Sequence, residues 1–407
     1  MEEEIIMKRV FVGDIRFTEE DKEAINKVLD SGRISEGKMV REFEKEFASY
    51  IGTKYAVALS SGTAALISGL TSLTHHSHFE VEKGSKIITS PLTYISTCNS
   101  IVLSGFEPVF VDVDPDFFGI TIESIEDAIN PEECYAILPV HLMGFPCNMD
   151  GLKIAANNHG LILLEDSAQA HGSSYNGKKT GSMGLWGAFS FYIAHNIQAG
   201  EMGAITTDDP EIYRLVKKLK SNGRMCDCPV CSRHQGKCPR LIVDDENDFD
   251  PRFTHDIIGY NFKLMEFQAA LGLNQLRKVD WIIQKRQKNV KYLNEKLNKF
   301  SSVFQLPRYS TEVSYLAYPI VIKDPKIITR KKLRKELEEK GIETRPLFGC
   351  IPTQQPAYSY LKEEYKDKLP VANYLGKNGF YIGCHQYLEQ EDLDYVTDIF
   401  DSIMKGL

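Results

Sequence analysis

The chain has 407 residues, with 48 Lys and Arg against 56 Asp and Glu, which gives a formal net charge of −8 at pH 7. This acidic balance argues against nucleic acid or an anionic membrane surface as the main partner. Hydrophobic residues make up 43% and charged residues 26%, as in folded globular proteins. The length is too great for one small core, so we expect a large domain over residues 1–280 and a small C-terminal domain over 281–407.

The N-terminal sequence MEEEIIMKRV has no basic segment followed by a long apolar one, and no apolar run is long enough to cross a bilayer. We therefore expect a cytoplasmic protein with no secretory signal and no membrane span. The sequence also shows no internal repeat and no low-complexity tail.

The first half of the chain alternates between helical patterns and short apolar runs. The first helix is expected over Asp14–Leu29, where Thr18 and Asp21 have the spacing of a capping box. From about residue 55 to 210 the alternation predicts an α/β fold with a mostly parallel sheet and helices on both faces. The expected strands are Ala56–Leu59, Lys86–Thr89, Pro108–Val113, Ala136–Val140, Leu161–Leu164, Ala188–Tyr192 and Ala204–Thr206, with helices between them such as Thr63–Leu73 and Ser96–Ser104.

Residues 221–256 interrupt this pattern with a stretch rich in Cys, Asp, Pro and Arg, which we expect to be a long excursion from the large domain. Two helices are expected after it. The remainder predicts a smaller α+β unit that contains a strand, a helix and a C-terminal helix. These expected elements are Leu264–Val279, Trp281–Asn298, Ala317–Ile322, Thr329–Lys340, Tyr381–Gly383 and a last helix from Glu391.

Three polar motifs stand at strand ends. SSGTAAL at 60–66 follows a strand and opens a helix, so its turn is either a phosphate seat or an ordinary N-cap. Asp166 follows an apolar strand and either faces a ligand crevice or caps a helix. His195 follows the strand that ends at Tyr192, and a lone histidine there is usually structural.

Four of the nine cysteines lie within thirteen residues, with the spacing C-x-C-x2-C-x6-C. In a reducing compartment such a group predicts metal ligands before disulfides. Four thiolates at this spacing suit either an iron–sulfur cluster or zinc. The four residues are Cys226, Cys228, Cys231 and Cys238.

In combination, the segments SSGTAAL (60–66), SPLTYISTCNSI (90–101), PVHLMGFPCNMD (139–150), EDSAQAHG (165–172), SFYIAHN (190–196) and GYNFKLMEFQAALG (259–272) resemble the DegT/DnrJ/EryC1/StrS sugar aminotransferase family. The resemblance covers nearly the whole chain, and it implies the fold of type I pyridoxal-phosphate enzymes, with the cofactor in the large domain. It also implies a homodimer with shared active sites and a nucleotide-sugar substrate.

The resemblance implies a role for each matching residue. Gly62, Thr63 and Ser190 are expected to hold the cofactor phosphate, and Tyr94 to stack on its ring. Asp166 is expected to pair with the ring nitrogen and keep it protonated. Gln169 is expected near the ring hydroxyl, and Asn261 is expected to reach the phosphate in a neighbouring subunit.

One residue departs from the family pattern, because His195 stands where the family has the lysine that forms the internal Schiff base. Imidazole has no primary amine, so we expect the chain to hold pyridoxamine phosphate noncovalently and to use His195 as a general base. This change resembles the sugar 3-dehydratases of the family, which deoxygenate C3 of a nucleotide-linked 4-keto-6-deoxyhexose. A degenerate, noncatalytic sugar-nucleotide binder is the alternative.

The family contains two dehydratase branches. One resembles GDP-4-keto-6-deoxymannose 3-dehydratase and has no metal. The other resembles CDP-4-keto-6-deoxyglucose 3-dehydrase, which has an iron–sulfur cluster and works with a reductase. The cysteine group favours the second branch. That branch takes one cysteine ligand from the position where this chain has Ala168, and here Cys231 would supply the fourth thiolate instead. The alternative is a metal-free-type enzyme with a structural zinc loop. Thr344–Pro346 and His385–Tyr387 are expected to contribute to the substrate pocket.

Overall fold

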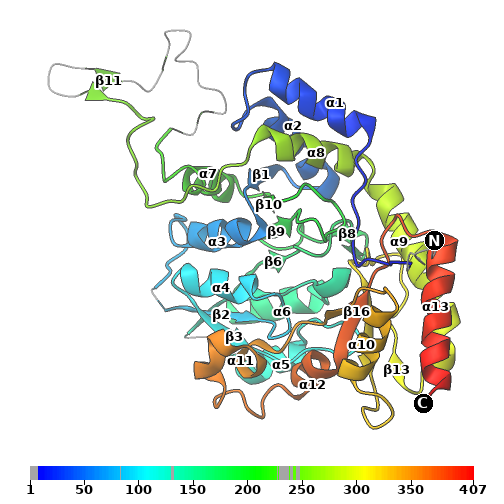
Figure 1. Cartoon of the computed structure of the whole chain (residues 1–407). Helices are drawn as coiled ribbons and strands as arrows, with labels where there is room; N and C mark the ends of the chain where they lie inside the picture. Colours follow the sequence, from blue (N-terminus) through cyan, green and yellow to red (C-terminus); the bar gives the residue numbers. More distant parts are fainter. Residues whose placement is uncertain are drawn as a thin grey trace.

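We analysed a computed structural model of the chain, which describes residues 8–82, 84–129, 133–226, 228, 238, 242–243 and 248–407. Helices surround a central sheet, and a second sheet lies nearer the C-terminal helix α13 (Figure 1). The helices are α1 (Glu19–Asp30), α2 (Lys38–Ile51), α3 (Gly62–Leu73), α4 (Ser96–Leu103), α5 (Ile122–Ala128), α6 (Met149–His159), α7 (Pro210–Leu219), α8 (Glu266–Arg277), α9 (Val279–Leu297), α10 (Arg330–Glu339), α11 (Ile351–Gln354), α12 (Pro370–Asn378) and α13 (Gln390–Lys405).

The central sheet has two parts that join around Asp166. The strands β3 (Glu107–Phe110), β2 (Lys86–Thr89), β4 (Cys134–Leu138) and β5 (Ile162–Leu163) pair in parallel in this order. The second part has the order β1 (Tyr55–Leu59), β10 (Gly203–Thr207), β9 (Trp186–Ser190) and β6 (Glu165–Asp166). A parallel bridge between Val140 and Asp166 joins the two parts. Asp166 therefore lies where the two parts of the sheet join.

The expected α/β fold is confirmed, with one difference in strand direction. β10 runs antiparallel to both β1 and β9, whereas the other pairings of the central sheet are parallel. The direction of a buried strand does not change its apolar pattern, so the sequence could not predict it. Helices α2, α7, α11 and α12 were not predicted. Helices α5 and α6 lie between expected strands, where helices were expected without stated bounds, and the expected strand boundaries differ from the observed ones by a few residues.

The capping box of α1 is present as expected. The backbone N–H of Thr18 donates to the carboxylate of Asp21 at 2.8 Å, and the Thr18 side chain faces the third residue of the helix. The Thr18 and Asp21 side chains together satisfy backbone groups that the first helical turn leaves open, which fixes where α1 begins.

The second sheet has the order β13 (Phe304–Gln305), β14 (Tyr318–Ile322), β16 (Gly379–Ile382) and β15 (Arg345–Pro346), all antiparallel. Two-stranded pairs are formed by β7 (Ser174–Tyr175) with β8 (Lys178–Lys179), and by β11 (Ile242–Val243) with β12 (Asp248–Phe249). One hydrophobic cluster includes Val10, Leu152 and Phe400, so both halves of the chain contribute to it. The division of the chain at residue 280 stays a prediction.

Within the described residues, no helix combines the length and the apolar character that a bilayer crossing requires. In Figure 1, β11 lies at the outer upper left, beyond α7 and well apart from β6 and β9. The described part of the cysteine-rich excursion is therefore separated from the centre of the sheet.

We predict that Gly203→Ala destabilises the protein by about 1–3 kcal/mol, because a Cβ atom at this position overlaps the backbone of Ser61 and lies 2.7 Å from the nitrogen of Gly62. Chemical denaturation measures the change. Gly13→Ala is the matched control, since its nearest neighbours lie at 3.5 and 3.7 Å, an ordinary contact distance. Equal stability of the two variants would contradict the close backbone approach.

Candidate active site

A cavity of about 590 Å³ opens where the strands of the central sheet end. Seven of the residues expected in the site line it, and Leu316, Arg345, Phe348 and Tyr381 enter from the C-terminal part of the chain. The seven are Gly62, Thr63, Tyr94, Asp166, Gln169, Ser190 and His195. The structure thus brings together residues that are far apart in the sequence, from Gly62 to His195.

The N-terminus of α3 forms one end of the cavity. Ser61 caps this helix, with its Oγ accepting a bond of 3.1 Å from the backbone N–H of Ala64. A Cβ atom on Gly62 would lie 2.5 Å from that of Ser190, so only glycine allows this approach of β9 to the helix. Free N–H groups and the helix dipole favour an anion here, and the geometry suits a phosphate group.

Asp166 occupies the floor of the cavity and is 3% exposed. Thr97 Oγ1 donates to Oδ2 at 2.8 Å, and the backbone N–H of Ala168 lies 3.2 Å from Oδ1. Burial raises the pKa of Asp166, while these two hydrogen bonds lower it. A buried carboxylate of this kind is stabilised by a cationic partner, so the site fits a protonated ring nitrogen.

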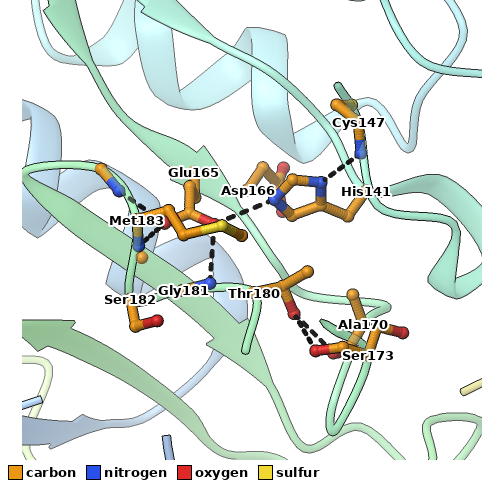
Figure 2. Close-up of polar contacts among 12 residues, drawn as sticks. His141, Cys147, Glu165, Asp166, Ala170, Ser173, Thr180, Gly181, Ser182 and Met183 are labelled. Atoms are coloured by element: carbon orange, nitrogen blue, oxygen red, sulfur yellow. Dashed lines mark hydrogen bonds and ion pairs between the residues drawn. The ribbon is translucent and has the colours of Figure 1, made fainter. Parts of the chain in front are cut away.

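Glu165, the residue before Asp166, faces the scaffold instead of the cavity (Figure 2). Its carboxylate accepts backbone N–H groups of Gly181, Met183 and Gly184 at 2.6–2.7 Å. It also lies 3.1 Å from Nε2 of His141.

The tautomer of His141 follows from its other ring nitrogen. Nδ1 of His141 accepts the backbone N–H of Cys147 at 3.1 Å, so the ring proton is on Nε2 and is donated to Glu165. The backbone N–H of His141 donates to the carbonyl of Asp166 at 3.0 Å. This network fixes the strand that carries Asp166.

The amide of Gln169 has a defined orientation. The backbone N–H of Met143 donates to Oε1 of Gln169 at 3.0 Å, and this leaves the Nε2 group as the available donor. Gln169 is 8% exposed and lines the cavity. It can therefore donate to a hydroxyl oxygen on a bound ring, in agreement with the expected role.

His195 lies on a turn after β9. Its backbone N–H donates to the carbonyl of Tyr192 at 2.8 Å. The ring is partly buried, and its Nδ1 has no hydrogen-bond partner among the described residues. Burial, together with the positive charge of Arg286, lowers the pKa of His195 to about 4. The imidazole is therefore neutral at pH 7 and can accept a proton at a ligand in the cavity.

Tyr94 forms the opposite wall. Its side chain is 57% exposed, and its ring centroid lies 5.8 Å from that of Phe348 at an interplanar angle of 61°. An exposed aromatic face beside a cavity is suited to stacking on a planar ligand. Its stacking role stays a prediction.

Asn261 lies apart from the seven residues. It is exposed, forms a bridge with Ser221 and does not line the cavity. Its expected contact is with a second subunit, so that role stays a prediction. Of the expected pocket loops, Arg345 and Pro346 line the cavity, but His385 and Gln386 are buried elsewhere in the packing.

The cysteine group is described only in part. Cys226, Cys228 and Cys238 are partly buried, and Cys231 lies outside the described residues. Within the described ranges, no group of three or more His, Cys, Asp or Glu side chains is arranged to hold a metal ion. The expected iron–sulfur or zinc site therefore has no support from the described thiols.

Two groups in the site were not predicted. Thr97 lies in the SPLTYISTCNSI segment, and its hydroxyl bonds Asp166 only because α4 packs beside β6. Arg286 is expected only as a polar position of a helix, yet it is fully buried behind the cavity. Sequence periodicity could not identify either contact, because both depend on tertiary packing.

Comparison with known proteins gives one family over almost the whole chain. The profile of the DegT/DnrJ/EryC1/StrS aminotransferase family matches residues 16–401. GDP-4-keto-6-deoxy-D-mannose 3-dehydratase of Escherichia coli O55:H7 is 31% identical over 92% of this chain and 95% of its own length. GDP-perosamine synthase of Caulobacter vibrioides is 31% identical over 98% of this chain and 99% of its own.

Solved structures agree with this match. The structure of the E. coli GDP-4-keto-6-deoxy-D-mannose-3-dehydratase with bound hydrated PLP superposes on this chain with a TM-score of 0.86 and 30% sequence identity. It covers 97% of this chain and 99% of its own. The expected fold of pyridoxal-phosphate-dependent aminotransferases is thereby confirmed.

We predict that the protein loses stability as the pH falls from about 6.5 towards 4. His195 and His385 have their pKa lowered to about 4 by burial, so the unfolded chain binds their protons first. Their contribution is complete above the unfolded pKa and is lost as the pH falls through the folded one. In His195→Asn the unfolding free energy should fall less steeply, by up to about 1.4 kcal/mol per pH unit. Parallel pH curves from denaturant titrations of the two proteins would contradict the burial of a neutral imidazole.

Proposed function

Because the chain belongs to the DegT/DnrJ/EryC1/StrS aminotransferase family, we propose that it is a pyridoxamine-phosphate-dependent dehydratase that removes the C3 hydroxyl of a nucleotide-linked 4-keto-6-deoxyhexose. The observation that carries the proposal is His195 at the turn where the family has its lysine. Of the described residues that line the cavity, none is a lysine.

The residues of the cavity fit the cofactor. Gly62, Thr63 and Ser190 would hold its phosphate at the N-terminus of α3, and Asp166 would hold its ring nitrogen. When bound, pyridoxamine phosphate supplies an amine that condenses with the 4-keto group and a ring that withdraws electrons. Gln169 would donate its Nε2 proton to the ring hydroxyl.

His195 performs the proton transfer in this proposal. Its neutral imidazole would take a proton from the cofactor carbon that bears the amine and pass it to the C3 hydroxyl of the sugar, which would leave as water. Imidazole cannot replace an amine in a covalent link to the cofactor, so repeated amino-group exchange through an enzyme-bound Schiff base is excluded at this position. The relatives include both dehydratases and a GDP-perosamine synthase, and His195 favours the dehydratases.

A second copy of the chain is part of the proposal. Asn261 follows Tyr260, whose backbone pairs with Asn222 and Leu219, and its own side chain is exposed. In this position it is available to a neighbouring cavity. We propose a homodimer in which each Asn261 contacts the cofactor phosphate of the other subunit.

The sequence also predicts an iron–sulfur cluster or zinc at the cysteine group. Among the described residues, which lack Cys231, no group of three or more His, Cys, Asp or Glu side chains is arranged to hold a metal ion, and no reaction step is derived through one. An electron-donating reductase is needed only if a cluster is present. The iron–sulfur dehydratase that the cysteine spacing predicts is the first candidate. The metal-free-type dehydratase or aminotransferase-like enzyme with a structural zinc loop is the second, and the noncatalytic sugar-nucleotide binder is the third.

We predict that His195→Asn abolishes the exchange of deuterium into the amine-bearing carbon of pyridoxamine phosphate, by about 10²-fold or more, while cofactor affinity stays within a few fold. Asparagine keeps a polar side chain of similar size but cannot accept the proton. NMR or mass spectrometry of the recovered cofactor measures exchange.

The control for this experiment is His159→Asn, which removes a surface imidazole beside Glu126. Normal exchange in His195→Asn would show that another group is the base. If the unaltered protein binds a nucleotide sugar but shows no exchange, the noncatalytic binder is correct.

We predict from the cysteine spacing that anaerobically purified protein contains an iron–sulfur cluster, with broad visible charge-transfer bands that the double variant Cys226→Ser/Cys228→Ser loses. Metal analysis of the same sample distinguishes the alternatives. Zinc without visible bands supports the zinc loop, and the absence of both metals contradicts any metal role for these cysteines.

A further inference from the structure

A fully buried guanidinium lies behind the cavity. Arg286 of α9 is 0% exposed, and its Nη1 donates to the carbonyls of Tyr315 at 3.2 Å and Leu316 at 2.7 Å. Its Nε donates to Oε1 of Gln386 at 3.1 Å. No carboxylate among the described residues pairs with it, and its Nη2 has no hydrogen-bond partner there. Burying an uncompensated charge costs free energy, so a function for this one is expected.

The two carbonyls belong to a strained turn. Tyr315 has a φ of 48°, in the left-handed region that residues with a side chain rarely adopt. Such conformations persist only where surrounding contacts fix them, and they are frequent at active sites. Here the contacts are the bonds of Arg286 and the Tyr315 hydroxyl, which donates to the carbonyl of Arg308 at 2.8 Å.

The same turn connects to the catalytic loop. Nδ2 of Asn196, the residue after His195, donates to the carbonyl of Ser314 at 3.1 Å. Three consecutive carbonyls, at 314, 315 and 316, therefore accept bonds from Asn196 and Arg286. A displacement of this turn would move the backbone that carries His195.

A second connection leads to the ring-hydroxyl site. The backbone N–H of Leu316 donates to the carbonyl of Met143 at 3.0 Å, and the N–H of Met143 bonds Gln169. Met143 also has a left-handed backbone, with a φ of 56°. Hydrogen bonds therefore connect Arg286, through the turn at 314–316, to Asn196 beside His195 and, through Met143, to Gln169.

The charge of Arg286 acts on the same histidine. The ring of His195 lies 6.2 Å from that of His171 and 6.1 Å from that of Tyr192, measured between centroids. The charged and titratable side chains that line the same cavity are Asp166, Glu201, Arg345 and Tyr381. His171 is fully buried, and burial lowers its pKa well below the usual value. Arg286 is the buried cation that opposes protonation of both imidazoles.

We propose that Arg286 is a positioning residue for the reaction, which holds the turn at 314–316 and through it the His195 loop and Gln169. The proposal rests on the proposed function of His195 as a base. Lysine could supply the charge but not the planar fork that reaches two carbonyls and Gln386.

Two variants test this role. Arg286→Met removes the charge and the bonds, whereas Arg286→Lys keeps the charge and loses the fork. Arg277→Met is the matched control, since Arg277 is a surface residue that pairs with Glu42 and Glu46. Histidine-labelled protein without cofactor is titrated by NMR, and His195→Asn identifies the resonance of His195.

In Arg286→Met the titration midpoint of His195 should rise by about one pH unit, and in Arg286→Lys it should stay low. In both variants, exchange at the amine-bearing carbon should fall about tenfold or more while cofactor affinity stays within a few fold. The midpoint in Arg286→Lys shows that the basicity of His195 is unchanged, so normal exchange in this variant overturns the positioning role.

The readouts also remain informative if a variant or the wider function fails. If Arg286→Met does not fold, Asn196→Ala tests the positioning role alone, since it removes the bond to Ser314 and should slow exchange without moving the His195 midpoint. If the unaltered protein shows no exchange, the proposed function fails, whereas the midpoints still test the influence of Arg286 on His195.

Discussion

The site depends on two adjacent carboxylates that face opposite ways in one short strand. Side chains alternate across a strand, so Glu165 points into the scaffold and Asp166 into the cavity. Glu165 is saturated by three backbone N–H groups and His141, which makes it a fixed anchor. Asp166 keeps bonding capacity for a ligand. The bridge from Asp166 to Val140 also joins the two parts of the sheet, so the anchor that fixes the sheet fixes the carboxylate that we propose to bind the cofactor.

The neutral state of His195 follows from its surroundings and not from the residue type alone. A histidine at the surface changes charge near neutral pH, but burial and the positive charge of Arg286 lower the pKa of this ring. Both effects disfavour the charged form. A base that is already neutral is suited to taking a proton from carbon, whereas the lysine of related enzymes is suited to a covalent link. In the proposed function, the chemistry changes with one side chain on the scaffold that the family shares.

Much of the fold and the cavity could be predicted from sequence, because both depend on local patterns. The strand before SSGTAAL, the capping box at Thr18 and the strand-end position of Asp166 are each encoded within a few residues. The direction of β10, the bond from Thr97 to Asp166 and the burial of Arg286 depend on residues far apart in the chain, so no local pattern reports them. Left-handed backbone at Met143 and Tyr315 was equally hidden, since the signal for it is usually glycine. Asn261 and the cysteine group require a second chain and Cys231, which the described residues do not include.

The most direct test of the account is the covalent state of the cofactor. The protein is loaded with pyridoxal phosphate, treated with borohydride to reduce any Schiff base, and weighed intact by mass spectrometry under denaturing conditions. The account predicts the mass of the unmodified chain, because His195 offers no amine at the site. A mass increase of one reduced cofactor, traced to a single lysine peptide, would contradict it.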